Sequence, residues 1–380
     1  MRKIVVASDS FKGCVSSKEI AKIAEIAIRK VFPACEIIKI PVADGGEGTV
    51  EAMVSAKNGH IVSCAVHGPL MQPVQAGYGI LEDGKTAVIE MASASGLTLI
   101  PEEKRNPMIT SSYGTGELIK DALSYGCRKF LIGIGGSATN DGGTGMLQAL
   151  GYRFLDKSGK ELGVGGQILK EIFTIDDSQV LPEVKMAEFI IACDVDNPFS
   201  GTNGAAHIYA RQKGADGQMV LELDKGLQNF AAVIIRTKNL DVEKIAGAGA
   251  AGGIGGGFVA FLNARLKSGI EMVLENIDFK NIISGSDLII TGEGKLDKQT
   301  GRGKVPAGVL KVAQVKQIPV IAIGGWIEEV EELNKAGYLA VLSLMPYPVT
   351  LQQAMQRDFT LENIKRTLVQ QFRIIQHFQL

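Results

Sequence analysis

Glycines alternate with hydroxyl, amide and carboxylate side chains in residues 132–146, which read IGIGGSATNDGGTGM. The apolar segment FLIGI leads into this stretch, and a short helix is predicted to start at Gly142 or Gly143 and to end at Leu150. The N-terminus of a helix presents unpaired backbone N–H groups and the positive end of the helix dipole, so it binds anions, most often phosphate. We therefore predict that this loop binds the phosphates of a nucleotide through Gly135, Gly136, Ser137, Thr139, Asn140, Asp141, Gly142 and Gly143.

Two other interpretations of this loop stay open on the residues alone. Gly133, Gly135 and Ala138 satisfy the G-x-G-x-x-G/A dinucleotide pattern, and Asp156 ends a candidate strand roughly 20 residues later, which together would indicate NAD. The residues after Gly135 are polar, however, where a dinucleotide fold begins an apolar helix. The loop could also be purely structural. A Walker A loop is excluded because the stretch contains no lysine.

Carboxylates also stand beside glycine after three other apolar segments. Asp9 follows KIVVAS, Asp44 ends EIIKIPVAD, and Glu293 and Asp297 lie in TGEGKLD. Because ligands of open parallel sheets bind outside the carboxyl ends of the strands, we expect these acids to share one edge, although each alone could merely cap a helix. The same edge is predicted to carry four cations, those of Lys12, Lys295, Arg302 and Lys304.

Two further acids, Asp194 and Asp196, follow a strand that is apolar up to Cys193, in the sequence CDVDNPFSGTNGA. They either cap the turn or hold a metal or a substrate hydroxyl. Mg²⁺ takes one or two carboxylates together with phosphate oxygens and water, which such loops supply. The four histidines show no spacing typical of metal ligands.

The elements that must position these loops fall into two groups. Strands over 3–8, 36–44, 286–294, 318–325 and 339–345 alternate with helical patterns, among them 303–315, 328–336 and 360–377, as in a parallel sheet. Ser16 and Glu19 form a capping box that starts the first helix, and Pro33 ends it. We predict one parallel-sheet domain from residues 1–60 and 286–380, interrupted by a mixed α/β domain over 61–285. A glycine-rich run at 246–258 is either a linker or a second helix N-terminus, followed by a helical pattern over 258–274.

Composition narrows the function classes. The net charge of −1 gives no electrostatic argument for nucleic acid or an anionic membrane as a partner. No apolar run approaches the roughly 20 residues that cross a bilayer, and the N-terminus does not fit a signal peptide, so a cytoplasmic protein is expected. The five cysteines lack CxxC pairing and are expected to be reduced. The oligomeric state stays open, and a homo-oligomer is compatible with the sequence.

Six ordered motifs resemble one known family. SDSFKG, PVADGGEGT, GIGGSATNDGG, ACDVDNPFSGTNGA, GAGAAGG and TGEGKLDKQTGRGKVPAGV together, across nearly the whole chain, are similar to the type 1 glycerate kinases. The resemblance implies a flavodoxin-like domain interrupted by a second α/β domain, ATP and Mg²⁺ as cofactors, and D-glycerate as the substrate. It also implies in-line phosphoryl transfer in the cleft between the domains, giving 2-phosphoglycerate.

This resemblance gives the polar residues their expected roles. Asp194, Lys12 and Lys295 are the expected catalytic residues, with Asp194 as base or metal ligand and the lysines on phosphate or on the glycerate carboxylate. Expected metal ligands are Asp194, Glu293 and Asp297. Expected substrate-binding residues are Ser10, Asp44, Glu47, Arg302 and Lys304. Two alternatives stay open: an NAD-dependent oxidoreductase acting on a small hydroxy acid, and a sensor that binds glycerate or a nucleotide without turnover.

Overall fold

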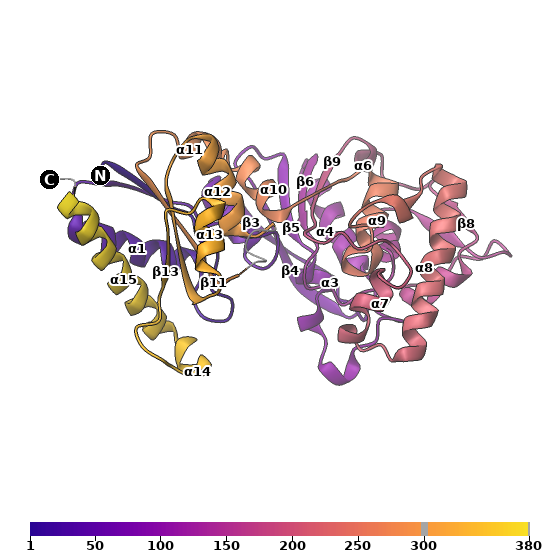
Figure 1. Cartoon of the computed structure of the whole chain (residues 1–380). Helices are drawn as coiled ribbons and strands as arrows, with labels where there is room; N and C mark the ends of the chain where they lie inside the picture. Colours follow the sequence, from indigo (N-terminus) through magenta and orange to yellow (C-terminus); the bar gives the residue numbers. More distant parts are fainter. Residues whose placement is uncertain (298–302, 379–380) are drawn as a thin grey trace. The chain divides into compact units, whose positions relative to one another are not determined.

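The computed structural model describes residues 1–297 and 303–378, and the chain divides into two compact units. Unit 1 consists of Met1–Asp44 and Val273–Leu380, and unit 2 of Gly45–Met272 (Figure 1). These boundaries differ from 60/61 and 285/286, where the change of pattern was expected. Helix α2 (Thr49–Ala56) packs on strands of unit 2, and β3 (His60–His67) pairs there with β4 (Pro73–Ile80), so both belong to unit 2.

Unit 1 is built on a five-stranded sheet in the order β13-β12-β11-β1-β2, in which every neighbouring pair is parallel. This is the flavodoxin-like order, so the predicted fold class is confirmed. The strands are β1 (Lys3–Val6), β2 (Glu36–Lys39), β11 (Leu288–Leu296), β12 (Val320–Ile327) and β13 (Ala340–Ser343). The helices that lie in unit 1 are α1 (Ser17–Val31), α11 (Phe279–Ile282), α12 (Val305–Val315), α13 (Val330–Ala336), α14 (Leu351–Ala354) and α15 (Arg357–Phe378).

The two long helices of unit 1, α1 and α15, pack together over one face of this sheet (Figure 1). Helix α1 begins where the sequence predicts. The Ser16 hydroxyl accepts a hydrogen bond from the Glu19 backbone N–H at 3.3 Å, and the Glu19 carboxylate accepts one from the Ser16 N–H at 2.9 Å. Its buried stripe includes Ile20, Ala24 and Ile28, which lie in the same core as the sheet residues Val6 and Ile290.

Unit 2 holds a six-stranded mixed sheet in the order β10-β9-β6-β5-β4-β3. Strands β3, β4 and β5 pair antiparallel, whereas β5, β6, β9 and β10 pair parallel, as expected of a mixed α/β domain. The remaining strands are β5 (Thr86–Glu90), β6 (Lys129–Gly133), β9 (Glu188–Ala192), β10 (Arg265–Lys267) and a separate hairpin of β7 (Arg153–Leu155) and β8 (Thr174–Asp176).

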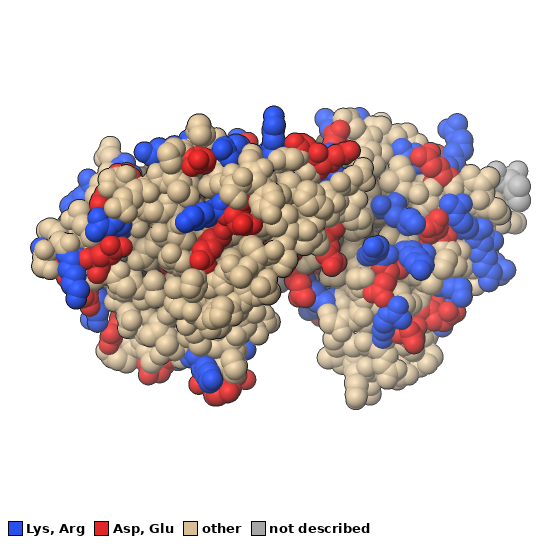
Figure 2. Space-filling model, turned by 180° about the vertical axis from the view of Figure 1, so that it is seen from behind, with Lys and Arg blue, Asp and Glu red and all other residues tan. Residues whose placement is uncertain are grey.

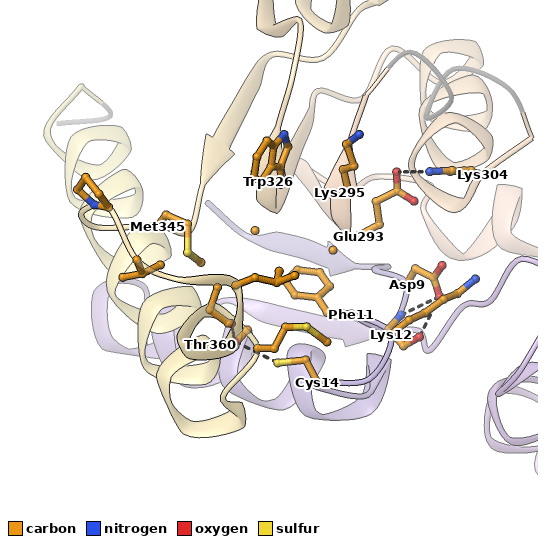
Figure 3. Close-up of a pocket in the computed structure, with 18 of the residues that line it drawn as sticks. Asp9, Phe11, Lys12, Cys14, Glu293, Lys295, Lys304, Trp326, Met345 and Thr360 are labelled. Atoms are coloured by element: carbon orange, nitrogen blue, oxygen red, sulfur yellow. Dashed lines mark hydrogen bonds and ion pairs between the residues drawn. The ribbon is translucent and has the colours of Figure 1, made fainter.

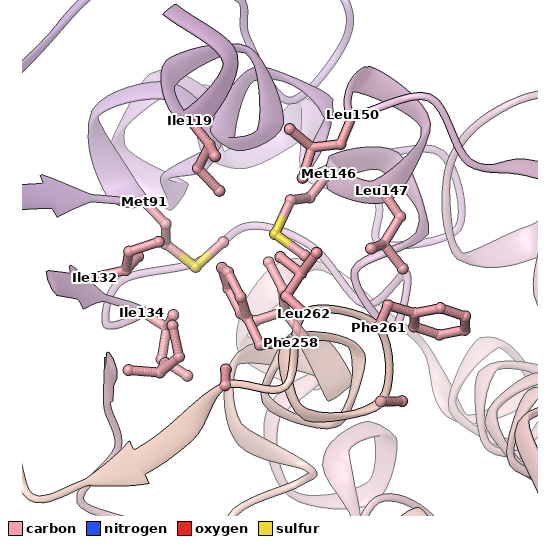
Figure 4. Packing of buried hydrophobic residues seen from close by; sticks show 14 of the residues in the cluster. Met91, Ile119, Ile132, Ile134, Met146, Leu147, Leu150, Phe258, Phe261 and Leu262 are labelled. Atoms are coloured by element: carbon pink, nitrogen blue, oxygen red, sulfur yellow. The ribbon is translucent and has the colours of Figure 1, made fainter. Parts of the chain in front are cut away.

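The helices of unit 2 enclose a large apolar core. They are α3 (Ala92–Ser95), α4 (Tyr113–Ser124), α5 (Thr144–Ala149), α6 (Pro182–Lys185), α7 (Ala205–Tyr209), α8 (Gly217–Lys238) and α9 (Ala250–Leu262), and α10 (Gly269–Asn276) spans the boundary between the units. Figure 4 shows Ile119 of α4, Met146 of α5, Phe258 of α9 and Ile132 of β6 in one apolar cluster. Helix α5, which follows the glycine-rich loop, is thus held deep in the core.

One predicted helix is wrong. The helical pattern over 258–274 is divided among the end of α9, strand β10 and the start of α10. Asn263 takes a left-handed conformation (φ 49°) and ends α9, because asparagine tolerates this conformation better than most residues. The apolar periodicity continues across the break, which is why the sequence alone suggests a single helix.

Candidate functional site

A cavity of about 640 Å³ lies in unit 1 and is lined by residues that follow β1 and β13 and by the last residues of β11 and β12. Strands β1 and β11 are neighbours in the sheet, while their chain connections lead to opposite edges. This is the point at which open parallel sheets bind ligands. Figure 3 shows acidic and basic side chains gathered on one side of the cavity, and Met345, Cys14 and Thr360 on the other.

Asp9 is the most buried acid of the cavity, with 4% of its surface exposed. Its backbone N–H donates to the Gly292 carbonyl at 2.9 Å, which ties the turn after β1 to β11. Its Oδ1 accepts from the Ser10 N–H at 2.7 Å. Burial raises the pKa of Asp9 from 3.8 to about 7, and the charges of Asp44 and Glu293 add to the rise. Sequence reasoning placed Asp9 at this edge but gave it no role.

Lys12 and Asp44 form an ion pair, with 3.1 Å between Nζ and Oδ2. Burial lowers the pKa of Lys12, but the nearby carboxylates of Asp44, Asp9 and Glu293 outweigh this effect and raise it above its ordinary value. The Lys12 ammonium therefore stays charged and faces a strongly acidic surrounding. Lys12, predicted to be catalytic, and Ser10 and Asp44, predicted to bind substrate, all line the cavity.

Lys304 lies between two further predicted site residues. Its Nζ is 3.4 Å from Glu293 Oε1 and 3.9 Å from Asp297 Oδ1. Lys295 Nζ contacts the other oxygen of Asp297 at 3.1 Å, and this hydrogen bond raises the pKa of Lys295. Glu293 and Asp297 thus enclose a position that is already filled by a cationic group. Arg302, a predicted substrate ligand, lies outside the described residues.

The acidic oxygens at this position fit Mg²⁺, which takes one or two carboxylates when phosphate oxygens and water complete its shell. Within residues 1–297 and 303–378, no three His, Cys, Asp or Glu side chains group closely enough to form a cage for a metal ion. The predicted ligand set is also split, because Glu293 and Asp297 belong to unit 1 and Asp194 to unit 2. A metal held jointly with substrate phosphates is therefore the arrangement that the donor set supports.

Asp194 is exposed in unit 2, directly after β9 and Cys193. Its Oδ1 accepts a hydrogen bond from the N–H of Gly269, the first residue of α10, at 3.1 Å. The side chain thus has the capping role that was weighed against catalysis, and its exposure leaves it accessible to a ligand as well. Glu47, predicted to bind substrate, is exposed just before α2.

The N-terminus of α2 is bonded to a carboxylate that the sequence analysis did not single out. Glu90, the last residue of β5, accepts from the Val50 N–H at 2.8 Å. The position of Glu90 in the apolar sequence TAVIEMA gave no signal, because the contact depends on β5 lying beneath α2.

In the glycine-rich loop, too, a carboxylate of the protein itself is bonded to the N-terminus of the helix that follows, here α5. Asp141 is fully buried, and its carboxylate accepts from the Ser112 N–H and hydroxyl at 2.8 Å each, from the Gly143 N–H at 3.1 Å and from the Gly145 N–H at 3.3 Å. The Gly142 N–H donates to the Gly252 carbonyl at 3.0 Å. The N–H groups of Gly142 and Gly143, which were expected to hold phosphate, are thus bonded within the protein. Phosphate binding by the loop stays a prediction, for which Gly135 and Gly136 are the exposed candidates.

The two glycine-rich stretches pack against each other. Helix α9 is kinked at residues 251–253, and a Cβ atom added at Gly252 would lie 2.1 Å from the Thr139 carbonyl oxygen. Only glycine permits this approach. Thr139 and Asn140 are fully buried here, and the Thr139 hydroxyl and the Asn140 side-chain amide have no hydrogen-bond partner in the part of the chain that is described. Of the two interpretations of the run at 246–258, a helix N-terminus with close backbone approach is confirmed.

A buried lysine supports the loop from the other side. Lys213 is 2% exposed, and its Nζ donates to the Ser137 hydroxyl at 2.8 Å and to the Thr139 carbonyl at 2.7 Å. Burial lowers the pKa of Lys213 from 10.5 to about 7, although the charge of Asp141 opposes the shift. Sequence reasoning missed this residue, since lysine in RQKGA carries no sign of burial.

The dinucleotide interpretation does not fit the structure. A ribose-binding acid ends a strand next to the one that leads into the glycine loop, but Asp156 follows β7, which pairs with β8 outside the six-stranded sheet. Its carboxylate accepts from the Ser158 N–H at 2.8 Å and the Lys160 N–H at 3.0 Å, so it closes its own turn.

The charge of the surface and the length of the helices bear on two further kinds of partner, nucleic acids and membranes. On the face that Figure 2 shows, lysines and arginines are interspersed with acidic residues and form no continuous patch of one sign. No helix in the described ranges is both long and apolar enough to cross a membrane.

Comparisons with known proteins agree with the motifs. The sequence model of the glycerate kinase family matches residues 4–376. The chain is 48% identical over 365 residues to glycerate 2-kinase of Escherichia coli, covering 96% of this chain and 95% of the relative. It is 47% identical over 355 residues to glycerate kinase of Bacillus subtilis, covering 93% of each. A crystal structure from Salmonella typhimurium LT2, assigned to glycerate kinase 2, superposes with a TM-score of 0.91 at 43% identity and covers 100% of this chain and 99% of the other. With its parallel sheet, its acidic and basic edge and these relatives, the chain belongs to the glycerate kinase family.

Proposed function

We propose that this protein transfers the γ-phosphoryl group of ATP to D-glycerate and forms 2-phosphoglycerate. The observation that carries the proposal is the edge of the unit 1 sheet, where Asp9, Asp44, Glu293 and Asp297 meet Lys12, Lys295 and Lys304. Phosphoryl transfer requires positioning and cations on the transferred group, with little covalent work by the protein. The family match over residues 4–376 supports the same reaction.

The lysines are proposed to hold anionic groups. Lys295 and Lys304 lie on the two sides of Asp297, so their ammonium groups can bind neighbouring phosphate oxygens. Lys12, paired with Asp44, is proposed to bind either the transferred phosphoryl group or the glycerate carboxylate. Charge at these positions matters most in the transition state, where it accumulates on the phosphoryl oxygens and the bridging oxygen.

The carboxylates have two proposed tasks. Glu293 and Asp297 would hold Mg²⁺, which would neutralise phosphate charge when it is bound with ATP. Asp44 and Ser10 would orient the glycerate hydroxyls. Asp194 stays the predicted base or metal ligand from unit 2.

A direct assay tests the proposal. ADP release should depend on both D-glycerate and Mg²⁺, and phosphorus NMR of the product should show a phosphate ester on the 2-hydroxyl. No ADP release from folded protein at saturating D-glycerate would remove the proposed reaction.

The charged edge is tested by substitution at Lys304. Lys304→Met should lower kcat/KM by at least about 10²-fold, the usual loss when one group that stabilises transition-state charge is removed. The matched control is Lys335→Met, because Lys335 pairs with Glu332 at 2.8 Å on the surface of α13. Equal kinetics of the two variants would show that Lys304 has no part in the reaction.

A further inference from the structure

One half of the unit 1 cavity is apolar and has no evident use for a three-carbon hydroxy acid. Its walls are formed by Phe11, Trp326, Met345, Tyr347, Leu351 and Met355. The cavity volume of about 640 Å³ lies in the range of sites for drug-sized ligands. A glycerate molecule bound to the charged edge would leave this half of the cavity unfilled.

Trp326 joins the apolar half to the charged half. In the parallel pair of β11 and β12, Trp326 lies opposite Lys295, so an aromatic ring and an ammonium group stand side by side at the carboxyl edge (Figure 3). The indole N–H donates to Glu328 Oε1 at 2.9 Å, which fixes the ring although 60% of the residue is exposed. A ligand that stacks on this ring reaches the lysine with its next charged group.

The opposite wall comes from the segment that follows β13 and from α14. Tyr347 is 56% exposed and Leu351 72% exposed, although both line the cavity. The Tyr347 ring meets Phe359 edge-on, with centroids 6.3 Å apart, which holds it in place. Exposed apolar groups gathered around one cavity mark a ligand site, because scattered surface residues would not line a common hollow.

We propose that this apolar half binds the adenine ring of the nucleotide, with the phosphates directed past Trp326 toward Lys295, Lys304 and Lys12. The proposal rests on the proposed function in taking ATP as the phosphoryl donor. It places the nucleotide in unit 1, whereas the sequence placed its phosphates on the glycine-rich loop of unit 2. A flat aromatic base matches the rings and methionines of the walls, and the adjacent lysines match the charge of its phosphates.

The chain supplies its own probe, since Trp326 is its single tryptophan. Titration with ADP in the absence of glycerate should quench or shift the intrinsic fluorescence along a saturable curve. D-glycerate alone should leave the emission unchanged, since it has no contact with the apolar half. Saturable quenching by D-glycerate and none by ADP would overturn the proposal.

Two variants test the walls without touching the charged edge. Tyr347→Ala should weaken ADP binding and raise the KM for ATP by about ten-fold, as the loss of a stacking partner does. Met355→Ala should change both in the same direction, and both variants should leave the KM for D-glycerate unchanged. The control is Tyr125→Ala, because Tyr125 is similarly exposed, at 60%, but belongs to unit 2 and does not line the cavity. Unchanged ADP affinity in both wall variants would refute the proposal.

Failure of the inference and failure of the proposed function give different results. If the protein binds ADP with the expected fluorescence change but releases no ADP from ATP with D-glycerate, the adenine site is supported and the proposed reaction is refuted. If the protein phosphorylates D-glycerate but shows no fluorescence response to ADP, the proposed reaction is supported and the adenine site is refuted.

Discussion

Replacing Asp141 separates a structural role of the glycine-rich loop from a nucleotide-binding one. Its carboxylate receives four hydrogen bonds, from Ser112, Gly143 and Gly145, and is fully buried. Asp141→Ala leaves these donors without an acceptor. Each buried unsatisfied donor costs about 1–3 kcal/mol, and the Ser112 hydroxyl can rotate to a new partner, so the three remaining N–H donors give an expected total loss of about 3–9 kcal/mol. For a domain of roughly 150–250 residues this corresponds to a fall in Tm of roughly 6–36 °C.

The assay is thermal unfolding monitored by circular dichroism, with ADP titrated at a temperature where the variant is folded. The matched control is Asp156→Ala, because Asp156 is only partly buried and also accepts several hydrogen bonds from its own turn. Its loss should cost less than about 1 kcal/mol because water replaces the acceptor. A stable Asp141→Ala variant with unchanged Tm and abolished ADP binding would refute the structural role and return Asp141 to the phosphate site.

Three further outcomes follow from single side chains. Asp194→Asn keeps the acceptor for the Gly269 N–H and removes the charge, so kcat and kcat/KM should both fall by at least about 10²-fold with little change in KM or Tm. A variant with wild-type kcat would show that Asp194 is not the catalytic residue. The pKa of Lys213 is about 7 in the folded protein and 10.5 in its ordinary state. Between these two pH values the unfolded chain binds the Lys213 proton and the folded chain does not, so the free energy of unfolding should rise with pH across this range. Urea titrations should show no such rise in Lys213→Met. The hydrogen bonds from Ser16 lower the pKa of Glu19 from 4.5 to about 2. Glu19→Gln should therefore be less stable than the wild type by about 1 kcal/mol at pH 7. This difference in stability should vanish as the pH falls through 2, because Glu19 of the wild type then becomes protonated.

The parallel sheet of unit 1 was predictable because its strands are short apolar runs separated by amphipathic helices. The capping box at Ser16 and the strand near 286–294 both appear close to their predicted positions. Such signals are local, and a few neighbouring residues suffice to produce them. The acidic and basic groups at the edge of the sheet were predictable for the same reason, since each follows a recognisable strand.

The parts that the sequence did not reveal depend on contacts between distant segments. Glycine near position 140 reads as a ligand loop, but the backbone approach of Gly252 to Thr139 can only be seen once α9 is placed against it. Lys213 is buried by the loop that it supports, and the apolar half of the cavity combines residues near 326, 347 and 355. No periodicity in the chain joins these positions.

The division of unit 1 across the sequence also sets an order of events during synthesis. The Lys3 N–H donates to Asp287, 284 residues later in the chain, at 3.0 Å, and β1 pairs with β11 in the same region. At about 5–20 residues per second, the ribosome needs roughly 15–60 s to supply that partner. Unit 2 is complete before then, so it can fold while β1, β2 and α1 are still waiting. During this interval the apolar face of α1 is uncovered, and an early stop within the last segment leaves a folded unit 2 attached to a permanently unfinished sheet.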